Sequence, residues 1–405
     1  MFNPNDWADL FKKSGAKYVV LTSKHHDGYC LWPNKEASLS FGMDWNSVDS
    51  GPKRDLVGDL TTALRDRTDL KMGLYYSIWD WFNPYWPEED QPTSRKKICN
   101  DVSRTKYINE VMYPQFKELV NLYSPAVIFS DGDWWMDDDK WETRPLLAWL
   151  FNNAPNKDEV VINDRWGKVR KKHGGYFTTE YGSGFEDPTI LWEENRGIGK
   201  SFGYNRNESY QEYNSSELLI LMLCDIVSRG GNFLLDIGPT SDGSVPFEII
   251  KRFNEIGEWL KFYGKSVYGA EAFDLRSNLH DWGLITYKHN KQGKHNVFLN
   301  IFDIKPGNNL NVTGITQKPS NAFLISKKSK IKLNFDFNKA FLKIKLPTDL
   351  PDPYVNLIEL EYDKRPTVDN DLVAKAKFNG YSLRLSNSKS HEGNYISNKS
   401  KREGS

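Results

Sequence analysis

The chain has 405 residues, which is long enough for one large domain and a smaller second one. Its 54 basic and 54 acidic residues give a net charge of zero, and no basic run predicts nucleic acid as a partner. We find no run long and apolar enough to predict a membrane span, so binding to a membrane is not expected either.

Aromatic residues make up 14% of the chain, and 14 of them are tryptophans. Such a content is typical of a large core with aromatic loops, or of stacking platforms for an uncharged, ring-shaped ligand. The cysteines lie far apart without Cys-x-x-Cys spacing, and so predict neither a disulfide framework nor a zinc site; they are Cys30, Cys99 and Cys224. Sequons for N-glycosylation begin at Asn207, Asn214, Asn311 and Asn398.

The first two thirds of the chain alternate between predicted helices and predicted strands. A helix that Asn5 can cap and Gly15 can end precedes the first strand, and a later helix has a possible kink at Pro114. The other helices are expected around residues 56–64, 108–120, 218–227 and 247–260. The predicted strands are residues 17–22, 71–77, 126–129, 160–163, 175–178, 201–204 and 232–235.

Continuous apolar strands that alternate with helices favour a parallel sheet covered on both faces. Each of these strands ends in polar residues, and barrels of eight parallel strands carry their active sites at the carboxyl ends of the strands. The seven strands therefore suggest a barrel from which one strand is missing at the front.

The pattern changes at about residue 271, where one domain (1–270) is predicted to end. Residues 330–337 and 342–346 alternate apolar and polar side chains, as half-buried antiparallel strands do. We expect a β-sandwich over residues 271–364. The Ser-, Asn- and Lys-rich tail, 365–405, is predicted to be disordered.

Six carboxylates crowd the stretch FSDGDWWMDDDKWE, which is residues 129–142. Asp131 lies two residues past the end of a predicted strand, and Gly132 allows a ligand to approach closely. The regular spacing of a calcium loop is interrupted by Trp134 and its neighbours, so a metal site is not favoured. The acids from Asp137 onward are expected to be solvated.

Polar and aromatic residues recur at four other strand ends. These are His25-His26, Tyr75-Tyr76, residues 163–166 and residues 179–181. Taken singly, each has an ordinary explanation, such as a capping histidine, an ion pair of Arg165 or a surface acid at Glu180. Taken together they suit glycoside hydrolysis, in which a retaining enzyme needs two carboxyl groups about 5–5.5 Å apart.

Several stretches resemble the α-L-fucosidases of glycoside hydrolase family 29. They are YVVLTSKHHDGYCLWPN, GLYYSIWDW, FSDGDWW, VVINDRWG, RGIGKSFGYNRNES and SRGGNFLLDIGP. The resemblance covers residues 1 to about 270 strongly, and the predicted sandwich to about 363 weakly. It implies a (β/α)8-like barrel followed by an antiparallel β-sandwich, retaining hydrolysis of terminal α-L-fucose from glycans, and no metal or organic cofactor.

The resemblance also implies roles for individual residues. Asp131 matches the nucleophile, and Glu180 in TTEY matches the acid/base, with Glu193 in LWEENRG as the second candidate. Residues that match contacts to the sugar are His25, His26, Tyr76, Phe129, Arg165 and Phe202. Of these, Phe129 stands where the family usually has tryptophan, and Phe202 matches an aromatic residue near the methyl group.

The family's first strand, an FGxFxHWG-type segment, has no counterpart in this sequence. We therefore expect a barrel that lacks its first strand, with two unpaired sheet edges and little activity from the chain as it stands. The alternative is a truncated, catalytically weak fucose-binding pseudoenzyme. Fucosylated glycans are the expected partners, a homo-oligomer is possible, and the family and the sequons imply a lysosomal or secreted location.

Overall fold

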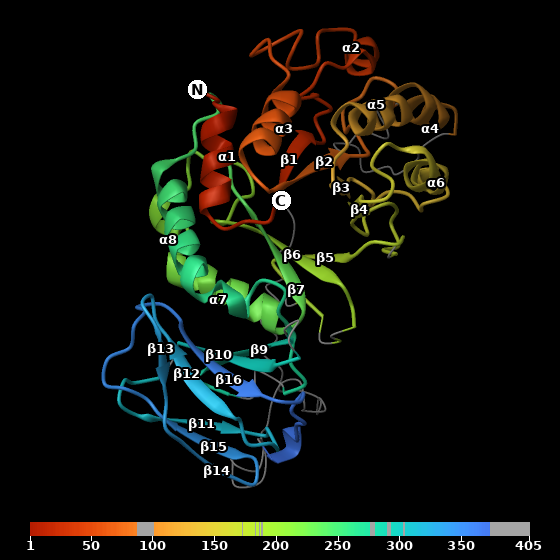
Figure 1. Cartoon of the computed structure of the whole chain (residues 1–405). Coiled ribbons are helices and arrows are strands. Elements are labelled where there is room, and N and C mark those ends of the chain that lie inside the picture. Colours follow the sequence, from red (N-terminus) through yellow and green to blue (C-terminus); the bar gives the residue numbers. More distant parts are fainter. Residues whose placement is uncertain are drawn as a thin grey trace, which may run out of the picture. The chain divides into compact units, whose positions relative to one another are not determined.

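The computed structural model describes residues 1–86, 101–171, 173–182, 184, 185, 187, 189–275, 280–289, 293–302 and 304–372. The chain divides into two compact units, Met1–Ala272 and Phe273–Ser405 (Figure 1). Cys99, the sequon at Asn398 and the predicted tail beyond residue 372 lie outside the described residues.

Parallel strands alternate with helices in the first unit. They are β1 (Tyr18–Lys24), β2 (Lys71–Ser77), β3 (Val127–Asp131), β4 (Val161–Ile162), β5 (Phe177–Glu180), β6 (Trp192–Gly197) and β7 (Gly231–Asp236). They form two parallel sheets, in the orders β1-β2-β3-β4 and β5-β6-β7. The Tyr176 amide, just before β5, donates to the Ile162 carbonyl at the end of β4 (3.1 Å), which links the two sheets.

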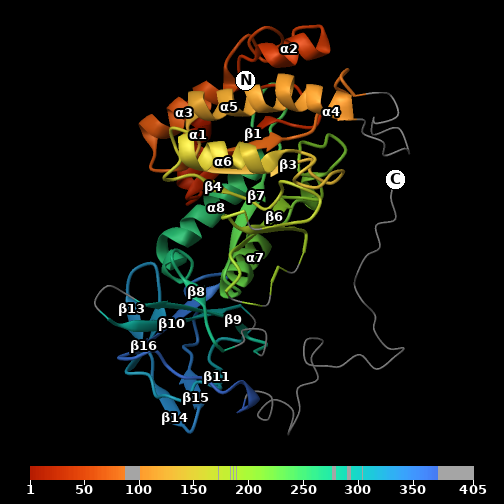
Figure 2. The same cartoon turned by 90° about the vertical axis from the view of Figure 1, so that its right-hand side faces the viewer.

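The helices of this unit include the five that the sequence pattern predicts, close to the expected positions, and others that it does not predict. They are α1 (Pro4–Lys13), α2 (Lys35–Phe41), α3 (Leu56–Arg67), α4 (Asp101–Tyr107), the π-helix η2 (Ile108–Met112), α5 (Tyr113–Tyr123), α6 (Thr143–Asn153), η3 (Tyr210–Glu212), α7 (Ser216–Ser228), α8 (Phe247–Tyr263) and η4 (Gly264–Ser266); a short strand, β8 (Glu271–Ala272), follows. The N-cap of α1 is Asn3 rather than Asn5, because Pro4 occupies the first turn. Pro114 likewise lies in the first turn of α5, and the predicted kink is replaced by the π-helical turn before it. Figure 2 shows α3, α5 and α6 side by side along the β1–β4 sheet.

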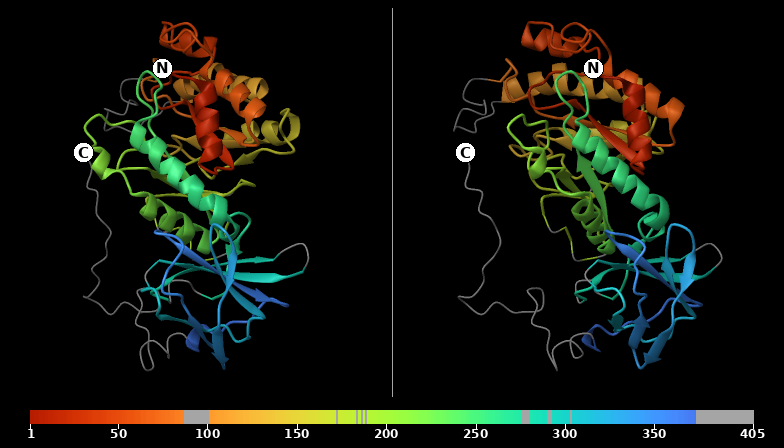
Figure 3. Two further views of the ribbon diagram at one scale, coloured as in Figure 1. Left: turned by 60° about the vertical axis from the view of Figure 1, so that its left-hand side comes forward. Right: turned by 90° about the vertical axis from the view of Figure 1, so that its left-hand side faces the viewer.

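The helix before β1 packs against the helix after β7. Phe11 of α1 contacts Phe253 of α8, with ring centroids 6.3 Å apart, and Figure 3 shows the two helices side by side. A side chain at Gly257 of α8 would lie 1.9 Å from the Lys13 carbonyl oxygen, so only glycine allows this approach. The alternating parallel strands and helices form a (β/α)8-like barrel. β1 and β7 are the edge strands of their sheets, and no described strand lies between them.

One predicted strand is wrong. Residues 201–204 belong to the loop after β6, and the strand itself lies earlier, at Trp192–Gly197. Its two adjacent carboxylates resemble a surface segment, but Glu193 and Glu194 are only 3% and 1% exposed. Glu194 is held by Arg196 Nε (2.6 Å), so a charged segment can form an interior strand.

The second unit is an antiparallel β-sandwich. Its strands are β9 (Gly283–His289), β10 (His295–Ile301), β11 (Asn309–Thr313), β12 (Asn321–Ile325), β13 (Lys330–Lys332), β14 (Phe335–Asn338), β15 (Phe341–Lys345) and β16 (Asn356–Tyr362). The larger sheet has the order β13-β12-β16-β10-β9 and the smaller β11-β15-β14. Alternating side chains such as Leu342 and Ile344 are buried between them. The unit continues past residue 364, because Val368 forms a β-bridge with Ile315; the tail was therefore predicted to begin too early.

Candidate active site

The carboxyl ends of the strands gather the polar residues of the first unit around Asp131. Asp131 is the last residue of β3 and is 7% exposed. Its carboxylate accepts hydrogen bonds from the Tyr75 hydroxyl (2.8 Å) and from Arg165 Nη1 (3.0 Å), and His26 Nε2 lies 3.6 Å away. We call the residues around it the active-site cluster: His25, His26, Tyr75, Asp131, Arg165 and Glu180.

The surroundings of Asp131 keep it ionised. Burial by itself would raise the pKa of its carboxyl, but Arg165, His26 and Tyr75 together bring this pKa below its ordinary value. Burial also works against the charge of Arg165, yet the two carboxylates at its side raise its pKa overall. A buried carboxylate that stays charged can act as a nucleophile.

Glu180 lies on the other side of the same guanidinium. It is the last residue of β5, its side chain is 41% exposed, and its Oε1 atom is 2.5 Å from Arg165 Nη1. Since Asp131 Oδ1 is 3.0 Å from that nitrogen, the two facing oxygens are at most 5.5 Å apart, the sum of the two distances. This upper limit is shorter than the roughly 6.5–9.5 Å of inverting glycosidases and allows the roughly 5–5.5 Å of retaining ones.

The two histidines present neutral rings to this site. His26 is buried, with Nδ1 2.8 Å from the Ser77 hydroxyl and its ring stacked on Trp81 at 4.5 Å. Burial, together with the neighbouring His25, lowers the pKa of His26 to about 4. His25 is more exposed and stacks on Tyr75 at 5.5 Å, and burial lowers its pKa as well. Neutral imidazoles both donate and accept hydrogen bonds, as sugar hydroxyls require.

Two of the predicted sugar contacts, Tyr76 and Phe129, are buried in the structure. Tyr76 does not reach the site: its ring is fully buried and its hydroxyl donates to Gln115 Oε1 (3.1 Å). Neighbouring side chains alternate across a strand, so the member of the pair that meets Asp131 is Tyr75. Phe129 is only 1% exposed, because it lies between the Tyr75 ring (5.8 Å) and the Arg165 guanidinium (4.9 Å) and offers no open face.

Among the described residues, Phe202 packs on the residue that follows Glu180 rather than on the active-site cluster. It belongs to the loop after β6 and is half-buried. Its ring centroid is 5.2 Å from that of Tyr181, the residue that follows Glu180. Besides Trp81, the His26 ring has a second tryptophan neighbour in Trp134, which is 41% exposed and 5.2 Å away.

Glu193, the second candidate for the acid/base, is not brought to the active-site cluster. It lies near the beginning of β6, is 3% exposed, and accepts a hydrogen bond from Tyr18 at the beginning of β1. Burial raises the pKa of Glu193 to about 7. The residue therefore lies toward the amino ends of the strands, whereas Asp131 and Glu180 are at the carboxyl ends.

Besides Asp131, two other acids of the 129–142 stretch are buried. Asp138, expected to be exposed, is 4% exposed and paired with Arg144 Nε (2.8 Å) and Lys171 Nζ (3.0 Å). Asp133 is fully buried, and burial raises its pKa to about 6. Sequence reasoning missed both, and only the basic residues that follow Asp138 at 144 and 171 were a signal.

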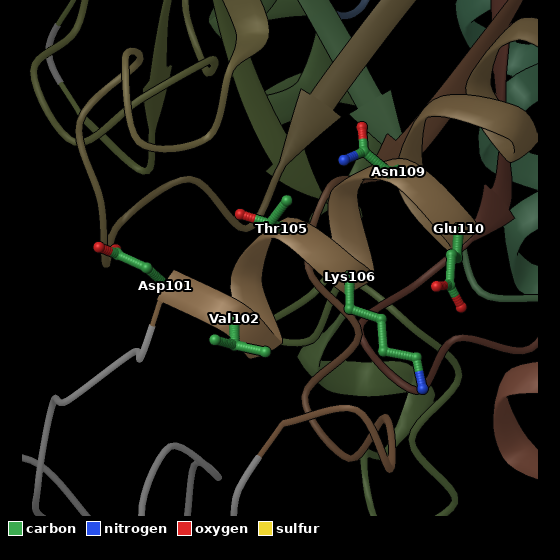
Figure 4. Close-up of a pocket in the computed structure, with 6 residues that line it drawn as sticks. All are labelled: Asp101, Val102, Thr105, Lys106, Asn109 and Glu110. Carbon is green, nitrogen blue, oxygen red and sulfur yellow. The ribbon is translucent and has the colours of Figure 1, made fainter.

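Other features of the described residues stay outside this site. A depression of about 540 Å³ lies on one side of α4 and η2 (Figure 4), and its lining residues are Asp101, Val102, Thr105, Lys106, Asn109 and Glu110. None of these residues belongs to the active-site cluster. Among the residues that the structure describes, no group of three or more His, Cys, Asp and Glu side chains is arranged to hold a metal ion. No helix in the same part of the chain is long and apolar enough to cross a membrane.

Comparison with known proteins gives one family. The sequence model of the alpha-L-fucosidase family matches residues 1–265. Alpha-L-fucosidase of Dictyostelium discoideum is 40% identical over 279 residues, which cover 68% of this chain and 58% of that protein. Plasma alpha-L-fucosidase of Rattus norvegicus is 45% identical over 276 residues, which cover 67% and 57%. The match thus spans less than two thirds of the length of these relatives.

Solved structures agree with the sequences. An alpha-L-fucosidase structure with 34% identity covers 89% of this chain and 78% of its own, with a TM-score of 0.72. Thermotoga maritima alpha-fucosidase in complex with fucose has a TM-score of 0.70 at 34% identity, over 89% of this chain and 79% of that one. The motifs, the strand-end carboxylates and these likenesses lead to one conclusion: the chain belongs to the α-L-fucosidases, glycoside hydrolase family 29.

Proposed function

We propose that this chain is a retaining exo-glycosidase that hydrolyses terminal α-L-fucose from glycoconjugates. The observation that carries the proposal is the contact of Asp131 and Glu180 with the same Arg165 nitrogen. It holds two carboxylates at a separation that suits a double displacement. The relatives named as alpha-L-fucosidases, and the related Thermotoga maritima structure that holds fucose, support the choice of sugar.

The reaction follows from the positions of the two carboxylates. Asp131 attacks the anomeric carbon of fucose and forms an ester, while Glu180 gives its proton to the departing glycosidic oxygen. Glu180 then takes a proton from water, whose oxygen attacks the same carbon and releases Asp131. The configuration at the anomeric carbon is inverted in each of the two steps, so the product retains the configuration of the substrate.

His25, His26 and Arg165 of the active-site cluster, together with Phe202, bind the sugar in this proposal. His25 and His26 are neutral, so they can pair with hydroxyl groups without requiring a charge on the substrate. Both carboxylates contact Nη1 of Arg165, so Arg165 donates to the hydroxyls or the ring oxygen of the sugar from its other nitrogens. Phe202, whose ring contacts that of Tyr181, supplies an apolar surface near the sugar.

The Glu180→Ala variant tests the acid/base role. Because a poor leaving group needs a proton, kcat/KM for a fucosyl disaccharide should fall by roughly 10²–10⁴-fold. An aryl fucoside with a nitrophenolate leaving group needs no proton, so its kcat/KM should fall far less. Rates of both substrates, measured for the wild type and the variant, give the comparison.

Glu193→Gln is the matched control, and it should show no such dependence on the leaving group. Its effect should appear in stability instead. The pKa of Glu193 in the folded chain is about 7, above its unfolded value of 4.5, so the wild type loses stability as the pH rises between these values. That loss is roughly 3 kcal/mol, and the variant should lack it in urea unfolding at pH 5 and pH 7.5. If Glu193→Gln shows the leaving-group pattern and Glu180→Ala does not, the acid/base role passes to Glu193.

We also propose a lysosomal or secreted location. The relatives include proteins named plasma and tissue alpha-L-fucosidase. Two sequon asparagines, Asn207 and Asn311, are exposed, whereas Asn214 is half-buried and donates to the Ile198 carbonyl (3.0 Å). In secretory cells we expect glycans on Asn207 and Asn311, detected by mass spectrometry after enzymatic deglycosylation. Two unmodified sites in the cell-derived protein would contradict this location.

A further inference from the structure

The guanidinium of Arg165 is held at two places besides the two carboxylates. Its Nε atom donates to the Thr178 hydroxyl (3.0 Å), and its central carbon lies over the Phe129 ring, 4.9 Å from the centroid. Because a guanidinium is planar and rigid, fixing its Nε–H and its face also fixes where Nη1 points. Nη1 is the nitrogen that contacts both Asp131 and Glu180. The position of this shared nitrogen therefore depends on Thr178.

The direction of the Thr178 hydroxyl is fixed in turn. A hydroxyl has one proton to donate and two lone pairs that accept. The proton of Thr178 goes to Asp164 Oδ1 (2.7 Å), so the lone pairs face two donors, Arg165 Nε and Arg170 Nη1 (3.1 Å). Asp164 is only 2% exposed, and the same oxygen accepts from the Thr178 amide (3.1 Å). Since a carboxylate accepts and does not donate, it sets Thr178 as the acceptor for Arg165.

The strand β5 carries this hydroxyl on the same face as the proposed acid/base. Thr178 and Glu180 are two residues apart in β5, so their side chains point to one face, and both contact Arg165. Thr179 lies between them and points to the other face, where its hydroxyl donates to Glu194. Thr178 therefore ties the Arg165 guanidinium to the strand that carries Glu180.

We propose that Thr178 is a positioning residue of the active site, which acts through Arg165 and holds its Nη1 atom where it meets both carboxylates. The inference rests on the proposed function. Without the bond from Thr178, Arg165 would keep its charge and its two carboxylate partners but would be free to tilt against them. The separation of Asp131 and Glu180 would then vary, and a double displacement needs both groups close to their productive positions.

Thr178→Val tests this role, because valine keeps the shape of threonine and removes the hydroxyl. Asp164 would still accept from the amide of residue 178 and from Arg170 Nη1 (3.3 Å), so its buried charge stays paired and the variant should fold. The lost hydrogen bond is one to a charged group, and kcat/KM for an aryl fucoside should fall by about 10–100-fold. Thr178→Ser restores the hydroxyl and should recover most of the rate.

The acidic limb of the pH profile separates positioning from stability. A poorly placed Arg165 lowers the pKa of Asp131 less, so the limb of kcat/KM for α-L-fucosyl fluoride should move to higher pH in Thr178→Val. It should return in Thr178→Ser. A variant that is merely less stable would keep the limb of its folded fraction. The variant leaves the other titratable groups around Asp131 unchanged; these are His25, His26, Tyr75, Asp133 and Glu180.

Thr179→Val is the matched control, since it removes the same hydroxyl from the next residue of the same strand. Glu194 would keep Arg196 Nε (2.6 Å) and the Gly182 amide (3.0 Å) as partners, and neither the rate nor the acidic limb should change. An unmoved limb in Thr178→Val overturns the proposal whatever the rate. An unchanged rate, equal losses in the two valine variants, or a loss that Thr178→Ser does not recover also overturns it.

NMR of the folded protein tests the positioning without any reaction. If the wild type hydrolyses no fucoside, the proposed function fails, and this measurement still decides the role of Thr178. The Nε–H proton of Arg165, identified by its loss in Arg165→Lys, should exchange slowly with water in the wild type and faster in Thr178→Val. The pKa of Asp131, followed by the carbon-13 signal of its carboxyl, should rise in the same variant. Unchanged exchange or an unchanged pKa would refute the positioning role.

Discussion

Replacing Asp131 by alanine should reduce hydrolysis of an aryl fucoside by roughly 10⁴-fold or more. The carboxylate is buried at the end of β3, and its pKa is lowered by Arg165, His26 and Tyr75 against the effect of burial. An alanine side chain cannot form the ester on which a double displacement depends. Steady-state rates of the wild type and of the variant, with folding checked by circular dichroism, measure the effect.

Asp139→Ala is the matched control for this experiment. Asp139 belongs to the same acidic stretch but is exposed, so its removal should leave the rate nearly unchanged. Asp138 is unsuitable as a control, because its loss would leave Arg144 and Lys171 without their buried partner and destabilise the fold. Similar losses of activity for Asp131→Ala and Asp139→Ala would contradict the nucleophile and favour a cation site that the stretch shares.

Replacing Arg165 by methionine should have the second large effect. The guanidinium is 3% exposed and contacts both carboxylates, so the change removes the group that fixes their separation. We expect kcat/KM to fall by roughly 10²–10³-fold for an activated fucoside. Arg165→Lys keeps the charge but not the planar array of donors, and should recover only part of the loss.

The loss of Arg165 should also shift the pH dependence of the activity. Asp131 acts as a carboxylate, so activity is lost as the pH falls through its pKa. Arg165 lowers that pKa, and without it the effect of burial is less opposed, so the pKa rises. The acidic limb of kcat/KM for α-L-fucosyl fluoride, which needs no proton from Glu180, should therefore move to higher pH. Arg170→Met, which removes a partner of Asp164 (3.3 Å) instead, should not move it. An unmoved limb in Arg165→Met would contradict this account.

The local pattern of apolar and polar residues was sufficient to predict most strands and helices of the first unit. Apolar runs such as those in β2 and β3 alternate with helices of regular period, and this alternation predicted parallel strands whose carboxyl ends carry the site. The placement of Asp131, His26 and Arg165 follows, because a polar residue that comes directly after a buried strand can only lie at its end. The change to alternating polar and apolar residues identified the sandwich in the same way.

The local pattern failed to predict segments whose polar side chains are buried against residues far away in the sequence. β6 was missed because its carboxylates are neutralised or hydrogen-bonded by side chains of other segments, such as Thr179 for Glu194 and Tyr18 for Glu193. The resemblance matches Tyr76 to a sugar contact, but the pairing of β2 with β3 decides which of the two adjacent tyrosines faces Asp131, and this is Tyr75.

By itself the sequence determined the family, the order of the strands and helices, and the residues that could react, since these depend on motifs and on periodicities set by near neighbours. Only the tertiary structure decided which carboxylates meet. Asp131 and Glu180 belong to different sheets, and their separation of at most 5.5 Å exists because the buried Arg165 side chain contacts both. Glu193, on the strand next to that of Glu180, lies near the other end of its strand and contacts Tyr18 instead of Arg165. Distances across a barrel depend on how its strands close around the core, and no local pattern records them.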